Sequence, residues 1–120
     1  MSLGKVAVYG SLRQGMGNHR VLGNSPLLGQ ARVSGFEMFS LGSFPFIRHG
    51  DGEITIEVYE VNEHTSMRLD MLEGYPSFYN REQIDTQYGQ AWIYFIDREE
   101  TTSPPVTHGD WVAYRTGTHA

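Results

Sequence analysis

The chain has 120 residues, 19% of them charged and 39% hydrophobic, so we expect one folded domain over residues 1–120 rather than a disordered or fibrous chain. Its net charge of −5, single lysine and scattered arginines exclude the basic stripe of a nucleic-acid-binding protein, and the absence of cysteine excludes disulfides, thiolate catalysis and cysteine-ligated zinc. The N-terminus carries no long apolar run, which predicts neither a signal peptide nor a membrane span and favours a cytoplasmic protein.

The N-terminal part of the chain predicts a strand followed by a glycine-rich loop. Residues 4–9 are apolar on both faces, as in a strand that is covered on both sides. Residues 10–17 break this pattern with glycines and predict a loop. Asn18 then offers an N-cap for a short helix that ends at Leu22.

The following segment predicts several strands. Residues 27–41 contain strand-like pieces, with turns or bulges at Gly29 and Gly35. Asp51-Gly52 is typical of a hairpin turn. Residues 53–61 alternate polar and apolar side chains, which predicts a strand with one buried face.

One clear helix follows these strands. Asn62 is a good N-cap, and Glu63 lies favourably in the first turn. The helix is predicted to run to about Glu73, because Gly74 and then Pro76 are typical of a helix C-terminus.

The C-terminal part returns to strands. Residues 79–86 and 90–96 predict a hairpin around Gly89, residues 97–105 a polar loop, and Trp111–Tyr114 a last short strand. We therefore expect an α+β domain: a small mixed, barrel-like sheet with one main helix and one short helix.

The loop after the first strand is a candidate anion site. Gly10 allows the backbone to approach a ligand closely, and successive N–H groups in such a turn attract a carboxylate or phosphate. Neither a P-loop nor a dinucleotide-binding motif is present. The alternative is a mobile connection without a ligand.

Glu73 is a candidate acid/base. It lies in the last turn of the predicted helix, where the helix dipole disfavours a negative charge, and one turn after Leu69, at the edge of the apolar stripe. Both effects raise a carboxyl pKa towards the range that suits proton transfer near neutral pH. The alternative is an ordinary solvated glutamate, tied to Arg81.

Other polar residues carry weaker signals. The five histidines show no metal-binding spacing, so we expect no metal and read them as surface or partly buried side chains. Ser11, Tyr75 and Tyr79 are the polar residues that we expect to flank a pocket.

Two stretches together resemble the gamma-glutamylcyclotransferase-like (AIG2-like) family. The first is Val8-Tyr9-Gly10-Ser11-Leu12-Arg13-Gln14-Gly15, and the second is Leu69-Asp70-x-Leu72-Glu73-Gly74-Tyr75-Pro76-x-x-Tyr79-x-Arg81. Weaker similarity extends the resemblance from about residue 5 to 115. It implies a small mixed-sheet barrel with a pocket beside the Tyr-Gly-Ser-Leu loop.

The resemblance also implies a reaction. The α-amine of a γ-glutamyl substrate attacks its own side-chain carbonyl, giving 5-oxoproline and a free amine or amino acid, without cofactor or metal. Glu73 matches the family's catalytic glutamate. The implied substrate-binding residues are Tyr9, Gly10, Ser11, Leu12, Tyr79 and Arg81, the last two as supporting residues.

Several points stay open at this stage. Ile56 stands where relatives often have glycine, so it either narrows the pocket or fills the core. Two alternative functions remain: a non-catalytic small-molecule binding module on the same fold, and an enzyme that acts on a γ-glutamyl group of a larger molecule. We expect a monomer with a small-molecule substrate and no nucleic-acid or membrane partner.

Overall fold

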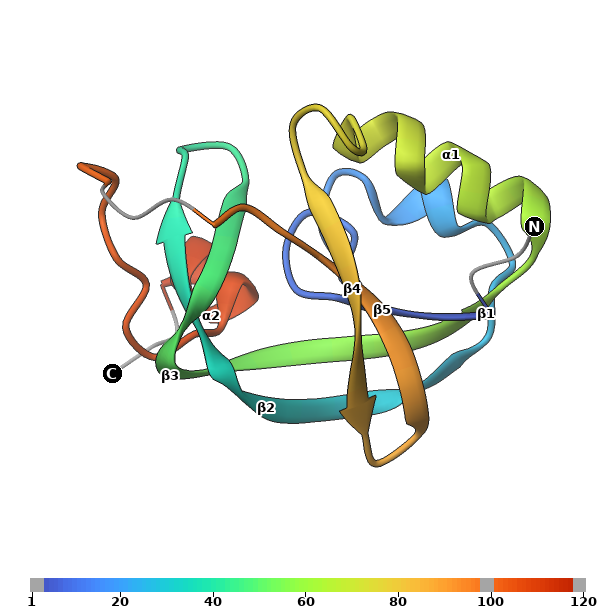
Figure 1. The fold of residues 1–120 in the computed structure, drawn as a ribbon, viewed down its shortest axis with the longest axis horizontal. Coiled ribbons are helices and arrows are strands. Elements are labelled where there is room, and N and C mark those ends of the chain that lie inside the picture. Colours follow the sequence, from blue (N-terminus) through green and yellow to red (C-terminus); the bar gives the residue numbers. More distant parts are fainter. Residues whose placement is uncertain (1–3, 98–100, 118–120) are drawn as a thin grey trace.

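The computed structural model describes residues 4–97 and 101–117, which form one strongly curved five-stranded sheet (Figure 1). The strands are β1 (Gly4–Val8), β2 (Leu27–Ser40), β3 (Pro45–Val61), β4 (Asn80–Thr86) and β5 (Gly89–Phe95). Their order in the sheet is β2-β3-β1-β5-β4. β1 pairs antiparallel with β3 and parallel with β5, so the sheet is mixed. The sheet closes only partly, which makes it a half-barrel.

Two α-helices complete the expected α+β fold. Helix α1 (Glu63–Glu73) crosses one end of the half-barrel, and α2 (Trp111–Thr116) lies beside the curled ends of β2 and β3 (Figure 1). The predicted limits of α1 are confirmed, since Asn62 accepts a hydrogen bond from the Thr65 N–H and Gly74 adopts the left-handed conformation. No helix among the described residues is long and apolar enough to cross a membrane.

The sheet is covered on both faces, which explains why β1 is apolar at successive positions. Val6 and Val8 belong to a cluster that includes Leu69 of α1, whereas Ala7 belongs to a second cluster that includes Trp111 of α2. The predicted strand at residues 53–61 is confirmed as the second half of β3. The expectation that only one of its faces is buried was wrong, because Ile54 to Tyr59 are all buried.

The hairpin predicted at Asp51-Gly52 was also wrong, because β3 continues through these residues. Ser34 lies opposite Glu53 but Phe36 lies opposite His49, so three residues of β3 bulge opposite Gly35. The bulge bends both strands instead of reversing the chain. The reversal comes at residues 41–44, between Ser40 and its partner Pro45. The expected bulge at Gly35 and another near Gly29 are confirmed.

Two terminal segments differ from their predicted form. Trp111–Tyr114 is helical rather than a strand, because Asp110 caps α2 by accepting a hydrogen bond from the Ala113 N–H. The short helix before Leu22 is a 3-10 turn, η1 (His19–Leu22), and the Asn18 side chain does not cap it. The hairpin of β4 and β5 around Gly89 is confirmed, and part of the polar loop predicted at 97–105 lies outside the described residues.

Candidate functional site

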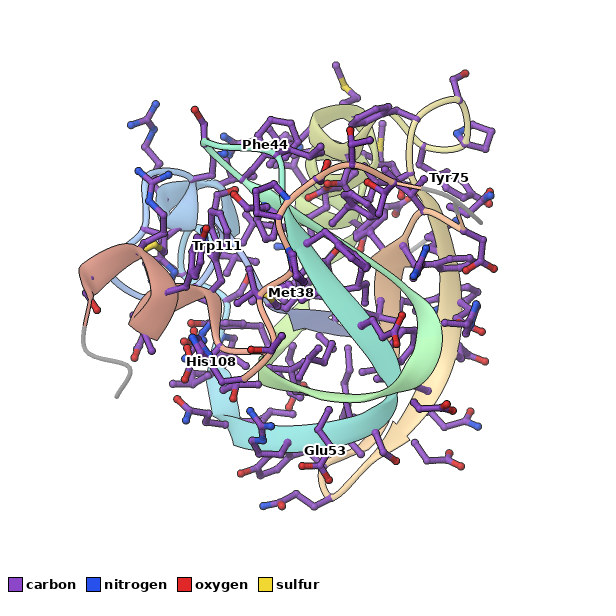
Figure 2. All side chains as sticks on the ribbon, turned by 90° about the vertical axis from the view of Figure 1, so that its left-hand side faces the viewer. Met38, Phe44, Glu53, Tyr75, His108 and Trp111 are labelled. Atoms are coloured by element: carbon purple, nitrogen blue, oxygen red, sulfur yellow. The ribbon has the colours of Figure 1, made fainter. Side chains whose placement is uncertain are left out.

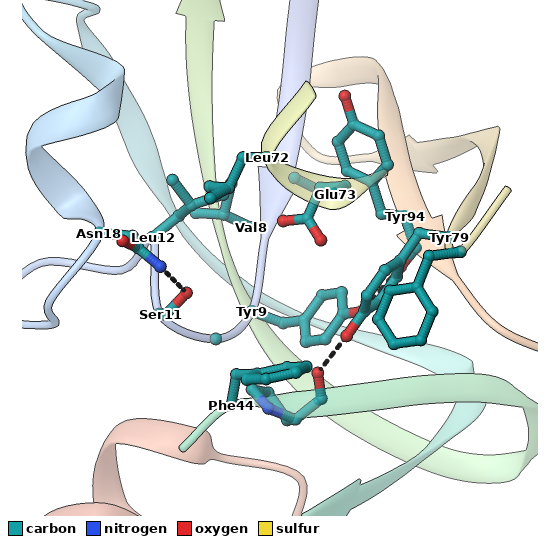
Figure 3. A pocket seen from close by; sticks show the side chains of 14 residues that line it. Val8, Tyr9, Ser11, Leu12, Asn18, Phe44, Leu72, Glu73, Tyr79 and Tyr94 are labelled. Atoms are coloured by element: carbon teal, nitrogen blue, oxygen red, sulfur yellow. Dashed lines mark hydrogen bonds between the residues drawn. The ribbon is translucent and has the colours of Figure 1, made fainter. Parts of the chain in front are cut away.

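A small cavity of about 200 Å³ lies where the end of β1, the end of α1 and the β2–β3 turn meet (Figure 3). The strands and loops bring together residues that are far apart in sequence. Its walls are formed by Ala7, Val8, Tyr9, Gly10, Ser11, Leu12, Asn18, Phe44, Pro45, Leu72, Glu73, Phe78, Tyr79 and Tyr94. The cavity is thus lined by Glu73 and by five of the six residues that were expected to bind substrate.

The glycine loop is fixed on one side of the cavity. A Cβ at Gly10 would lie 2.7 Å from the Pro45 ring, so only glycine fits without a shift. Asn18 binds Ser11 twice, from its backbone N–H to the carbonyl at 2.9 Å and from Nδ2 to Oγ at 3.0 Å. These bonds favour an ordered loop over a mobile one. No described residue accepts a hydrogen bond from the Ser11 or Leu12 N–H, which leaves two donors for a ligand.

Glu73 enters the same cavity from the last turn of α1. Figure 3 shows its carboxylate directed into the space between the loop and the tyrosine rings. Burial raises the pKa of Glu73 from its ordinary value of 4.5 to about 7. Among the described residues, no donor makes a hydrogen bond or ion pair with this carboxylate. Glu73 is therefore a carboxyl group that changes protonation near neutral pH.

Three tyrosines complete the polar part of the wall, and each hydroxyl donates to another protein group. Tyr9 donates to the Tyr94 carbonyl at 2.8 Å, Tyr79 to the Pro45 carbonyl at 2.7 Å, and Tyr94 to Asp70 Oδ1 at 2.7 Å. Burial is the main cause that raises the pKa of Tyr9 and of Tyr94, and the Glu73 carboxylate raises both further. Tyr9 and Tyr94 therefore stay neutral, and the hydrogen bonds of all three tyrosines hold the shape of the wall.

Arg81 lies outside the cavity lining and does not pair with Glu73. Its Nε is 3.5 Å from Asp70 Oδ1, and its guanidinium stacks on the rings of Tyr75 and Trp92 at 4.1 and 4.8 Å. Asp70 also accepts a hydrogen bond from the Tyr94 hydroxyl, so Arg81 acts on the cavity wall indirectly, through Asp70 and Tyr94. Tyr75, which we expected to flank the pocket, is outside the lining as well.

The sequence alone did not identify several lining residues. Phe44 comes from the β2–β3 turn, Pro45 is the first residue of β3, and Tyr94 lies on β5. Leu72 lies in the last turn of α1, and Phe78 follows the helix. Leu72 and Phe78 could have been predicted to lie near the site, because both fall within the second motif, before and after Glu73. No sequence pattern near Phe44 predicts that it lines the cavity, because its position depends on how the hairpin of β2 and β3 folds back towards α1. Ile56 lies in the core and does not line the pocket.

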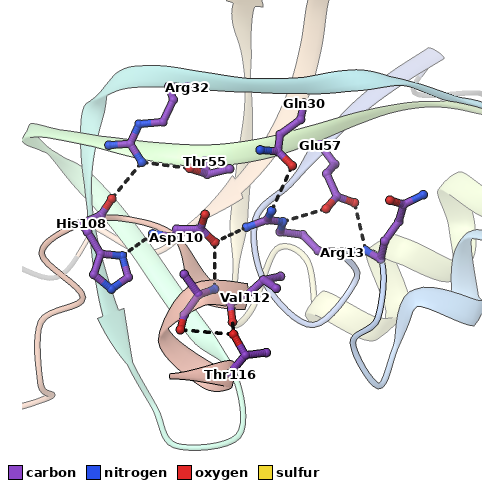
Figure 4. A network of polar contacts seen from close by, with 11 residues as sticks. Arg13, Gln30, Arg32, Thr55, Glu57, His108, Asp110, Val112 and Thr116 are labelled. Carbon is purple, nitrogen blue, oxygen red and sulfur yellow. Dashed lines mark hydrogen bonds and ion pairs between the residues drawn. The ribbon is translucent and has the colours of Figure 1, made fainter. Parts of the chain in front are cut away.

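A buried polar network holds the far side of the glycine loop (Figure 4). Arg13 is only 4% exposed, and its guanidinium binds Glu57 at 2.8 Å and Asp110 at 2.7 Å. Glu57 also accepts hydrogen bonds from the Gln14 N–H at 3.0 Å and the Tyr59 hydroxyl at 2.8 Å. Arg13, which directly follows the Tyr-Gly-Ser-Leu sequence, thus anchors the loop to β3 and to the N-terminus of α2. The sequence placed Arg13 in the first motif but assigned it no role.

Residues 4–97 and 101–117 contain no group of three or more histidine or acidic side chains that could hold a metal ion. His64 is exposed, as expected. His49 stacks on Phe36 and contacts the carboxylates of Glu82 and Asp97. These two carboxylates raise the pKa of His49 and outweigh the opposing effect of burial.

Similarity to known proteins extends along nearly the whole chain. A model of the family described as gamma-glutamyl cyclotransferase, AIG2-like, matches residues 6–113. A Vibrio cholerae relative is 40% identical over 107 residues, which cover 88% of this chain and 93% of that protein. The gamma-glutamylcyclotransferase family protein YtfP of Escherichia coli is 35% identical over 108 residues, with coverages of 90% and 96%. The crystal structure of a Pyrococcus horikoshii protein superposes with a TM-score of 0.83 at 27% identity, covering 96% and 95%.

Proposed function

This chain belongs to the gamma-glutamyl cyclotransferase, AIG2-like family, and we propose that it cyclises a γ-glutamyl amine or γ-glutamyl amino acid to 5-oxoproline with release of the free amine. The observation that carries this proposal is the Glu73 carboxylate. It faces the cavity without a partner among the described residues and has a pKa raised to about 7. Such a group both takes and returns a proton near neutral pH.

The proposed reaction is an intramolecular transfer. Glu73 takes a proton from the substrate's α-ammonium group, and the free amine attacks the γ-carbonyl carbon. A new C–N bond closes the five-membered ring, and the original amide C–N bond breaks. Glu73 then gives this proton to the leaving nitrogen, and the second proton that the ring nitrogen loses as the lactam forms also passes to the released amine, which leaves as an ammonium ion. Neither water nor a cofactor is consumed.

The loop and the tyrosines have supporting roles in this proposal. The free N–H groups of Ser11 and Leu12 hold the substrate's α-carboxylate, while Gly10 gives it access to the backbone. Tyr9 and Tyr79 form walls that keep the substrate folded, so that the attacking and attacked atoms stay close. Arg81 supports the wall through Asp70.

The test is to measure 5-oxoproline release by mass spectrometry from a panel of γ-glutamyl amino acids and γ-glutamyl amines. We expect Glu73→Gln to lower kcat by about 10²–10⁴-fold, the usual contribution of a positioned acid/base. Glu60→Gln is the matched control, because Glu60 is exposed on β3 and outside the cavity. Equal rates for wild type and Glu73→Gln would remove Glu73 from the mechanism. Absence of product from both would favour a binding module or a larger γ-glutamyl substrate.

A further inference from the structure

The inner and outer parts of the cavity differ in character. Glu73, the glycine loop, Asn18 and the three tyrosines supply its polar groups. Three apolar lining residues are also largely exposed: Phe44 at 39%, Leu72 at 42% and Phe78 at 46%. Residues that both line a cavity and remain exposed form its mouth. We call Phe44, Leu72 and Phe78 the apolar rim. Figure 2 shows Phe44 at the end of the molecule where α1 lies, opposite Glu53.

The cavity is too small for a long substrate. Pockets for drug-sized ligands measure roughly 300–1,000 Å³, and this one measures about 200 Å³. It suits a group of amino-acid size. A γ-glutamyl group held by the loop and Glu73 would occupy it, and the group on the amide nitrogen would then extend to the rim.

The rim offers no partner for a negative charge. Among the described residues that line the cavity, Glu73 is the one with a side chain that becomes charged near neutral pH, and none is a lysine, arginine or histidine. Nearby Arg81 lies outside the lining, with its Nε 3.5 Å from Asp70 Oδ1 and its guanidinium over the rings of Tyr75 and Trp92. Its Nε and Nη1 have no hydrogen-bond partner among the described residues, but both atoms are buried. With a net charge of −5, the protein as a whole also disfavours a second carboxylate.

We propose that the released amine carries an apolar, uncharged group, which binds against the rim of Phe44, Leu72 and Phe78. This inference rests on the proposed function and narrows its substrate class to γ-glutamyl amides of apolar amines, in preference to γ-glutamyl amino acids. Burial of the amine's carbon atoms against three exposed apolar side chains supplies affinity. A carboxylate on the same amine would lose water there and gain no cation.

A second cavity next to the first offers an alternative position for the leaving group of the substrate. It is lined by Ser11 and Asn18, which it shares with the first cavity, and by Trp111 and Arg115. A leaving group that passed Ser11 and Asn18 would meet the Arg115 guanidinium, and acidic groups would then be preferred. The two directions therefore predict opposite selectivities.

The test compares two substrates that differ only in one carboxylate, γ-glutamyl-phenethylamide and γ-glutamyl-phenylalanine, with γ-glutamyl-methylamide as a third. We expect kcat/KM for the phenethylamide to be at least tenfold higher than for either of the others. Leu72→Arg adds a cation at the rim and is expected to reduce the discrimination against γ-glutamyl-phenylalanine at least fivefold. Leu27→Arg is the matched control, since Leu27 is 40% exposed and outside the cavity.

Each outcome has a separate meaning. Equal rates for the matched pair, or preference for γ-glutamyl-phenylalanine, would overturn the inference and leave the proposed function standing. If the enzyme preferred γ-glutamyl-phenylalanine and the Arg115→Gln variant lost this preference, the leaving group would bind in the second cavity. Absence of 5-oxoproline from all three substrates and from the wider panel would overturn the proposed function and this inference with it.

Discussion

Glu57 and Glu73 are two carboxylates in the same small domain with opposite surroundings. Glu57 is buried on β3 and receives bonds from Arg13, the Gln14 N–H and the Tyr59 hydroxyl. Glu73 faces a cavity at the end of α1, with no described donor, and its pKa is raised to about 7. A carboxylate that is paired with several donors thus fixes a loop, whereas one that faces a cavity without a described donor is able to exchange a proton.

The largest effect is expected from removing Arg13, the cation that pairs with Glu57. Arg13→Met leaves Glu57 buried without its charged partner, and we expect a loss of about 3–5 kcal/mol in the free energy of unfolding. Urea unfolding measures it. Adding Glu57→Gln to Arg13→Met should recover part of the loss, because the unpaired charge is then gone. A loss below about 1 kcal/mol would mean that solvent reaches Glu57.

The second prediction concerns pH. Between pH 4.5 and about 7, Glu73 is ionised in the unfolded chain but still protonated in the folded one. The folded state then binds more protons, so stability falls as pH rises through this window and levels off above it. We expect a fall of about 2 kcal/mol, since one pKa unit corresponds to ~1.4 kcal/mol and partial exposure reduces the total.

Glu73→Gln isolates this effect, because its amide does not titrate. The difference in unfolding free energy between wild type and variant, measured by urea titration at pH 4.5 to 8, should show the slope. A pH-independent difference would contradict the raised pKa. The same titration governs catalysis in the proposed mechanism, where kcat/KM rises with pH through about 7 as Glu73 becomes ionised.

The smallest effect is expected from removing a single neutral hydrogen bond to Glu57. Tyr59→Phe removes one of three donors and leaves the ring in place, so we expect a loss of about 1 kcal/mol in stability. Unfolding by urea and 5-oxoproline release are both measured. Activity should stay within about twofold, since Tyr59 is outside the cavity. A large loss of activity without loss of stability would show that Glu57 also acts on the reaction.

Features specified by neighbouring residues could be predicted from the sequence. Asn62 and Gly74 define α1 through bonds within a few residues, and Gly89 defines the hairpin of β4 and β5 in the same way. The glycine loop and Glu73 were predicted individually, and the family resemblance joined them. Their meeting in one cavity depends on β1 and α1 packing together.

Features set by distant contacts could not be predicted. Asp51-Gly52 looks like a turn, yet its partners on β2 make it a bulge in a continuous strand. Trp111–Tyr114 has strand-like side chains, but the Asp110 cap makes it helical. The burial of Arg13 depends on acceptors 44 and 97 residues later in the chain. No local pattern contains that information.

The central place of β1 has a consequence for how the chain acquires its structure. β1 precedes the other four strands in the chain, but its neighbours in the sheet lie at residues 57–61 and at Trp92. Contacts this distant in sequence slow folding, because a long loop must close before they form. We therefore expect a nascent chain to remain incompletely folded until β5 has left the ribosome. Because Tyr94 follows Trp92 closely, the wall of the cavity is among the last parts to assemble.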